Sequence, residues 1–138
     1  MTDLELMQAA VQAREAAYAP YSGFCVGAAL LTCDGKLYLG CNIESASYTP
    51  TNCAERTAFF KAVSEGERSF AAIAVVGARR GDPLSFCAPC GVCRQVMAEF
   101  CGPDFRILLG TPEHFTVHTL SELLPYSFSL SENGGGSV

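Results

Sequence analysis

Two short cysteine motifs, far apart in the chain, constrain its fold most strongly. The first is Cys53-Ala54-Glu55 and the second is Pro89-Cys90-Gly91-Val92-Cys93. Their three thiolates are ligands that suit zinc, and a zinc ion that takes part in catalysis keeps its fourth position for water. If the three cysteines bind one ion, the fold must bring the two segments together.

Glu55 adds a carboxylate two residues from a predicted ligand. Such a group lies close to the metal without binding it, so it can move protons for the reacting water. Taken alone, Glu55 also fits a capping box with Asn52, and Cys-x-x-Cys alone fits a zinc knuckle or a redox pair. The combination favours a catalytic zinc bound by Cys53, Cys90 and Cys93, with Glu55 as the proton shuttle.

Both motifs fall at the starts of predicted helices. The first helix is predicted over residues 53–65 with Asn52 as its cap, and the second over 90–100 with Ala88 or Pro89 at its opening. Helix N-termini carry partial positive charge and lower the pKa of nearby thiols. Two such ends that face each other would gather the three thiolates around one ion.

Three thiolates and one Zn²⁺ leave a net negative charge, which weakens zinc as a Lewis acid. A neighbouring cation would correct this, and two arginines lie next to motif residues in the sequence. They are Arg56, which follows Glu55, and Arg94, which follows Cys93.

A closed, structural zinc site is the competing interpretation. Cys87 lies near the second motif, and a fourth thiolate from it would complete the coordination and make the chain a zinc module for protein binding. The eight cysteines could also form disulfides. The opening Met1–Glu5 lacks the basic start of a signal peptide, so we expect a reducing, cytoplasmic location instead.

Composition narrows the class of partner. The formal net charge is −5, and Lys and Arg number only nine, which disfavours a nucleic-acid partner. No apolar run approaches the roughly 20 residues that span a membrane. Hydrophobic residues make up 49% and charged residues 17% of the chain, as in a compact globular domain. The acidic charge favours a small-molecule substrate over DNA or RNA.

The remaining pattern predicts an α/β fold in which a mixed sheet of about five strands lies between helices as a three-layer α-β-α sandwich. We predict one catalytic domain over residues 1–130 and a flexible, Gly/Ser-rich tail over 131–138. Helical spacing runs from Leu4 to Ala17, and a short helix is expected at 120–124. Strands are predicted at 24–32, 36–42, 71–76, 84–86 and 105–109.

With these motifs the chain resembles the small, homotetrameric, zinc-dependent cytidine deaminases of pyrimidine salvage. The resemblance covers about residues 14–128. It lies in five separate segments in the same order, namely Tyr18–Phe24, Val26–Leu30, Gly40–Tyr48, Cys53–Ala58 and Pro89–Gln95. The chain departs from the family at Cys25, where relatives often have Pro, and at Ala88, where many have Ser or Thr.

The resemblance implies a hydrolase with one Zn²⁺ per subunit, bound by the three motif cysteines. Water activated by the metal would attack C4 of cytidine, and 2′-deoxycytidine would be a second substrate. Glu55 would move protons from the water to N3 and to the departing ammonia, and Arg56 would offset the thiolate charge.

The resemblance also implies the substrate contacts. Asn42 and Glu44 would bind the ribose hydroxyls, although ordinary loop polarity explains both residues equally well without it. Phe24 would pack near the nucleoside, with core packing as the alternative, and the Ala54 backbone would contact the pyrimidine.

Two aromatic residues would be shared between the subunits of a homotetramer. Phe128 would reach a neighbouring subunit's site, with a cover for the domain's own surface as the alternative, and Tyr48 would belong to the same region. The alternatives in function are a deaminase of a modified cytosine nucleoside such as blasticidin S and the structural zinc module. A polynucleotide deaminase fits the short, acidic chain poorly.

Overall fold

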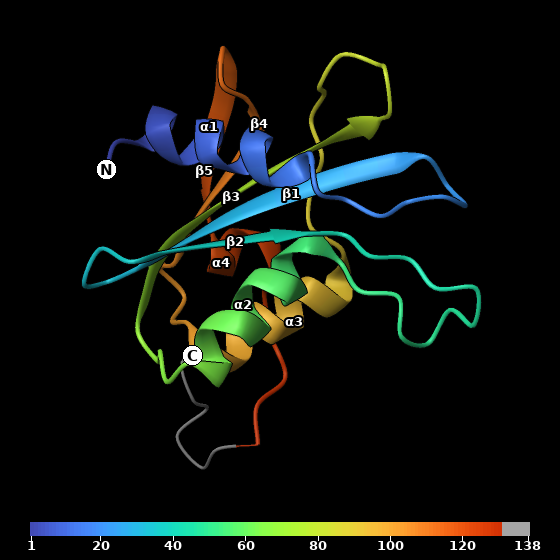
Figure 1. The fold of residues 1–138 in the computed structure, drawn as a ribbon. Coiled ribbons are helices and arrows are strands. Elements are labelled where there is room, and N and C mark those ends of the chain that lie inside the picture. The colour runs from blue at the N-terminus through green and yellow to red at the C-terminus, as the bar shows by residue number, and fades with distance from the viewer. Residues whose placement is uncertain (131–138) are drawn as a thin grey trace.

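A computed structural model describes residues 1–130 as a five-stranded mixed sheet with helices on both faces (Figure 1). The elements, in chain order, are α1 (Asp3–Arg14), β1 (Phe24–Thr32), β2 (Leu37–Cys41), α2 (Ala54–Ser64), β3 (Phe70–Arg79), α3 (Gly91–Phe100), β4 (Arg106–Thr111), β5 (His114–Thr119) and α4 (Leu120–Leu123).

The strand order across the sheet is β2-β1-β3-β4-β5. The β1 strand pairs antiparallel with both β2 and β3, and β4 pairs antiparallel with β5. The β3 and β4 strands are parallel, and the connection between them contains α3. A parallel pair needs such a crossover, because the chain must return to the same end of the sheet.

The α1 helix covers one face of the sheet (Figure 1). A capping box begins it, since the Thr2 hydroxyl accepts from the Glu5 amide and the Glu5 carboxylate accepts from the Thr2 amide. Alternate strand residues point to this face, and several are small, as at Ala29 and Ala74. Gly27 lets the helix backbone come closest, because a Cβ there would lie 2.5 Å from the Arg14 amide nitrogen.

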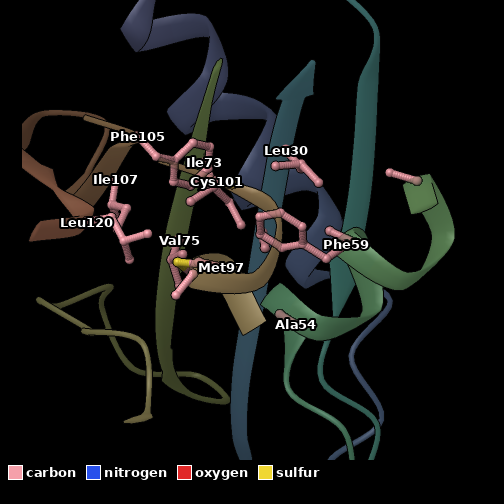
Figure 2. Close-up of a cluster of buried hydrophobic side chains, with 14 of the residues drawn as sticks. Leu30, Ala54, Phe59, Ile73, Val75, Met97, Cys101, Phe105, Ile107 and Leu120 are labelled. Carbon is pink, nitrogen blue, oxygen red and sulfur yellow. The ribbon is translucent and has the colours of Figure 1, made fainter. Parts of the chain in front are cut away.

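The opposite face packs against α2, α3 and α4 and carries the larger hydrophobic cluster (Figure 2). Phe59 of α2 lies at its centre, fully buried, with its ring centroid 5.1 Å from that of Phe70. Leu30 and Ile73 approach from the sheet, and Met97 approaches from α3. The burial of these apolar side chains fixes the positions of α2 and α3 on the sheet.

The predicted fold class is confirmed, but one strand was assigned to the wrong segment. Residues 84–86 form no strand, and Ser85 makes only an isolated bridge with Gly77. The fifth strand is β5, which pairs with β4 at the sheet edge. Its exposed residues include Val117, so the strand lacks the continuous apolar run that a buried strand shows.

The first helix is also shorter than predicted, since it ends at Arg14 and not near Ala17. Tyr18 instead forms a parallel bridge with Ile43. This pairing uses the Tyr18 backbone groups, which therefore cannot continue the helix. In the described part of the chain, no helix is long and apolar enough to cross a membrane. The predicted flexible tail, 131–138, lies outside the described residues.

Substitution of Gly27 by Ala tests the close contact of α1 with the sheet. The added Cβ would overlap the Ala10 carbonyl oxygen and press on the Arg14 backbone. We expect the free energy of unfolding to fall by about 2–3 kcal/mol, measured by urea denaturation at a fixed zinc concentration. Gly91→Ala is the control, since a Cβ at Gly91 meets nothing within 4 Å. A Gly27→Ala variant that is as stable as the parent protein would contradict this account.

Candidate metal centre and active site

Cys53 occupies the N-cap of α2 and makes no side-chain capping hydrogen bond. Its thiol is therefore not engaged by the helix backbone. The predicted cap, Asn52, is not the N-cap, and its amide donates instead to the Thr57 hydroxyl at 3.2 Å. Gly40 of β2 lies directly below this first turn, because a Cβ on Gly40 would be 2.6 Å from the Ala58 amide nitrogen. Because Gly40 has no side chain, the first turn of α2 can lie directly against β2.

Cys90 is the N-cap of α3, one residue beyond the predicted opening at Ala88 or Pro89. Its sulfur accepts a hydrogen bond from the Cys93 amide at 3.4 Å. Cys93 lies in the first helical turn and is only 1% exposed. The second motif therefore presents both of its sulfurs at one helix N-terminus, as the sequence predicted.

The two helix starts meet, and the three thiols form one cluster. The Cys53 and Cys90 sulfurs are 3.7 Å apart, and those of Cys90 and Cys93 are 3.4 Å apart. All three sulfurs lie within 4.8 Å of one another. Tetrahedral zinc with Zn–S bonds of about 2.3 Å would place its sulfur ligands roughly 3.8 Å apart. The donor set and its spacing therefore fit zinc with one position left open.

The thiols share protons in a way that favours a bound cation. The hydrogen bond from Cys93, followed by the contact with Arg56, lowers the pKa of Cys53 to about 5. The same hydrogen bond, together with burial, raises the pKa of Cys93, which is the donor. A metal ion replaces such shared protons and stabilises all the thiolates together.

Of the two candidate cations, only Arg56 serves the cluster. Its Nη2 donates to the Cys53 sulfur at 3.1 Å, and its Nε is the one buried side-chain nitrogen or oxygen without a partner in residues 1–130. Arg94 does not contact the thiols, so that prediction was wrong. Its guanidinium donates to the carbonyl oxygens of Pro89 at 2.8 Å and Leu123 at 2.7 Å, and so ties α3 to the segment before it and to the end of α4.

Glu55 lies in the first turn of α2 and is 4% exposed. Burial raises the pKa of its carboxyl to about 7. A group with this pKa can both accept and release a proton near neutral pH, as a general acid–base catalyst must. The capping-box alternative does not hold, since Asn52 is not the helix cap.

A cavity of about 220 Å³ joins these groups to the predicted substrate residues. Its lining residues include Cys53, Cys90 and Glu55 together with Asn42 and Glu44. The wall also includes Val26, Thr51, Asn52, Ala54, Cys87 and Ala88. The structure thus brings three predicted substrate-contact residues, Asn42, Glu44 and Ala54, into the metal site's cavity.

Sequence reasoning missed part of this wall. Val26 was interpreted as a strand residue in the Val26–Leu30 segment and was given no role at the site, although its alternation with Gly27 places it on the face that carries α2. Thr51 lay in a segment interpreted as loop. Its hydroxyl accepts from the Ser45 amide at 2.9 Å, and a sequence pattern does not reveal such a contact.

The other predicted substrate residues lie outside the wall of this cavity. Tyr48 is 82% exposed and lines an adjoining cavity of about 310 Å³, which shares Glu44 with the first. Phe24 packs over Gly77 beside Val26 and Cys87. Phe128 is 68% exposed, and the Gln95 amide holds its backbone through hydrogen bonds of 2.7 and 3.3 Å.

Comparison with known proteins assigns the family. The sequence profile described as "Cytidine and deoxycytidylate deaminase zinc-binding region" matches residues 1–109. Cytidine deaminase of Sporosarcina psychrophila is 55% identical over 129 residues, covering 91% of this chain and 90% of that protein. Cytidine deaminase of Halalkalibacterium halodurans is 54% identical over 128 residues, covering 92% and 94%.

A solved structure indicates the same family. The crystal structure of cytidine deaminase from Burkholderia pseudomallei superposes with a TM-score of 0.85 and 51% sequence identity, covering 93% of this chain and 100% of that chain. The chain therefore belongs to the cytidine and deoxycytidylate deaminase family, and Cys53, Cys90 and Cys93 form its zinc site.

Zinc analysis of Cys87→Ser separates an open site from one with four protein ligands. In the described residues, Cys87 is not part of the thiol cluster, and burial raises the pKa of its thiol to about 11. We expect about one zinc ion per chain in this variant, as in the parent protein, measured by mass spectrometry of the metal. Cys53→Ser is the matched variant that should lose metal. Loss of zinc from Cys87→Ser would support the structural alternative.

Proposed function

We propose that this chain is a zinc-dependent hydrolase of pyrimidine salvage that converts cytidine and water to uridine and ammonia, and also accepts 2′-deoxycytidine. The observation that carries the proposal is a single cavity lined by two cysteines of the thiol cluster, Cys53 and Cys90, by Glu55 and by the polar pair Asn42 and Glu44. The similar proteins named cytidine deaminase support this substrate class.

The proposed chemistry divides between the metal and Glu55. Zinc held by the three cysteines supplies Lewis-acid activation of water at neutral pH. Glu55 takes a proton from the water that attacks C4, and then delivers protons to N3 and to the amino group, which leaves as ammonia. Its burial in the cavity wall beside Cys53 supports this role. The Ala54 backbone contacts the pyrimidine, and Arg56 offsets thiolate charge through Cys53.

Hydrogen-bond accounting supports one sugar-hydroxyl site at Asn42 and Glu44. The Asn42 amide uses its oxygen to accept from the Val26 amide at 2.9 Å and one N–H to donate to the Phe24 carbonyl at 2.8 Å. One N–H remains. The Glu44 Oε1 atom accepts from two amides, and Oε2 accepts from one hydroxyl, so Oε2 keeps one site. One donor and one acceptor suit one hydroxyl.

Conversion of cytidine to uridine, followed by ultraviolet absorbance, tests the function directly. We expect turnover by the purified, zinc-loaded protein. Glu55→Gln should keep its zinc and lose roughly 100- to 10,000-fold in kcat, because the amide cannot carry the proton. Glu113→Gln, in the exposed β4–β5 turn, is the matched control and should retain full activity.

Two results would contradict the proposal. Full activity of Glu55→Gln would remove the proton-shuttle role. A folded, zinc-loaded parent protein that leaves cytidine unchanged would exclude the proposed substrate, and modified cytosine nucleosides such as blasticidin S would then be assayed.

We also propose that the protein is a homotetramer whose sites are shared between subunits. Phe128 and Tyr48, the two residues expected to reach a neighbour, are 68% and 82% exposed. An exposed apolar groove of about 430 Å³ lies along α2 and α3, lined in part by Phe60, Val92 and Phe100. Exposed apolar surface of this kind is typical of protein–protein contacts.

Mixed assemblies test the shared site. Phe128→Ala should raise KM for cytidine in its own homo-oligomer, while Glu55→Gln should be inactive. When the two variants are co-expressed, an intact Glu55 can meet an intact Phe128 from its neighbour, so kcat/KM per intact Glu55 should recover. Sedimentation gives the oligomeric state. A fully active monomer, or mixed assemblies without recovery, would rule out the shared site.

We propose, finally, that residues 1–130 act as one catalytic domain in the cytoplasm, without a nucleic-acid partner or a membrane. Both hydrophobic clusters pack on the same sheet, which supports one domain. All eight cysteines lie in the described residues as free thiols, which suits a reducing compartment. The net charge of −5 supports a small-molecule substrate over nucleic acid.

A further inference from the structure

Glu44 lies where the two adjoining cavities meet, and a loop from before β1 holds its carboxylate. The backbone amides of Tyr21 and Ser22 donate to Glu44 Oε1 at 3.0 and 3.2 Å. The Ser22 hydroxyl donates to Oε2. Both carboxylate oxygens are therefore fixed by neighbouring residues, 22 and 23 positions away in the sequence.

The loop that makes these contacts is itself fixed. The Tyr18 amide donates to the Asn42 carbonyl at 2.9 Å, and the Glu44 amide donates to the Tyr18 carbonyl at 2.8 Å. Farther along the loop, Gly23 adopts a φ of 72°, a conformation that favours glycine, and Arg79 donates to the Ser22 carbonyl at 3.1 Å. Ser22 thus approaches Glu44 from a defined position.

The Ser22 hydroxyl forms a bridge between the strand and the carboxylate. It accepts from the Phe24 amide at 3.0 Å, which leaves its own hydrogen free to point at Glu44 Oε2. Ser22 makes the one side-chain hydrogen bond to the Glu44 carboxylate that the structure shows within residues 1–130. These contacts also lower the pKa of Glu44, with the Ser22 hydroxyl as the largest cause, and so favour the acceptor form.

We propose that Ser22 is a positioning residue for sugar recognition, whose hydroxyl fixes the Glu44 carboxylate so that one acceptor site on Oε2 faces the substrate cavity. The proposal rests on the sugar-binding role of Glu44 in the proposed function. Without the Ser22 hydroxyl, Oε2 would have two unmet acceptor sites and the Phe24 amide would lose its acceptor. The carboxylate could then turn toward solvent, and a substrate hydroxyl would have to order it on binding.

Steady-state kinetics of Ser22→Ala test this role. We expect KM for cytidine to rise roughly five- to thirtyfold, as for the loss of one charge-assisted hydrogen bond, with kcat nearly unchanged. The inhibition constant of 2′,3′-dideoxyuridine, which lacks both sugar hydroxyls, should stay the same, whereas that of uridine should rise with KM. Inhibition by 2′-deoxyuridine and 3′-deoxyuridine then shows which sugar hydroxyl donates a hydrogen bond to Glu44.

Three variants sharpen the test. Ser22→Thr keeps the hydroxyl and should restore KM to near the parent value. Ser22→Ala added to Glu44→Ala should have no further effect, since its partner is already gone. Ser64→Ala removes a serine hydroxyl that is also exposed and that donates to the Lys61 carbonyl at the far end of α2, and it should change neither KM nor the inhibition constants.

A purely structural role for Ser22 predicts a different pattern. If Ser22→Ala weakens uridine and 2′,3′-dideoxyuridine equally, or leaves the KM for cytidine unchanged, the positioning role is excluded. If Ser22→Ala fails to fold, the comparison uses Ser22→Thr. A KM for Ser22→Thr that differs from that of the parent protein would then exclude the positioning role. Turnover of cytidine by the parent protein is measured before any variant is compared. Its absence would contradict the proposed function and not the role of Ser22.

Discussion

The convergence of two helix N-termini on three thiols is the constraint on which the site depends. Cys53 begins α2 and Cys90 begins α3, and their sulfurs lie 3.7 Å apart. Thiolates so close repel one another unless a cation lies among them, and the metal is strongest in that role. The helix dipoles and Arg56 reduce the remaining negative charge. Glu55 lies in the first turn of α2, two residues after the Cys53 cap. The same helix start therefore positions both the ligand and the carboxylate.

The sheet makes that convergence possible because it carries both helices on one face (Figure 1). Gly40 lets the start of α2 lie against β2, and the parallel pair β3 and β4 brings α3 back over the same face. The core between them is aromatic and aliphatic, with Phe59 and Met97 fully buried. Packing of α2 and α3 thus sets the distance between the sulfurs, and the metal adds to an arrangement that the core already favours.

Sequence patterns predicted most of this arrangement, because the relevant signals are local or carried by motifs. Ligand spacing, helix starts and buried strands all leave marks within a short window, and the three-thiol cluster was confirmed. The β5 strand was missed because an edge strand with exposed residues has little apolar periodicity. Arg94 was misplaced because its neighbour Cys93 points to the cluster, while its own guanidinium reaches the carbonyls of Pro89 and Leu123.

The sequence by itself determined the donor set, the carboxylate beside it and the α/β class, since these follow from residue type and spacing. The tertiary structure decided which groups share the cavity. It placed Cys87 outside the thiol cluster and tied Ser22 to Glu44 across two loops that lie far apart in the chain. Contacts of this kind depend on how the backbone folds in three dimensions, because the orientation of a side chain follows from its strand or loop neighbours. No spacing in the sequence encodes that orientation.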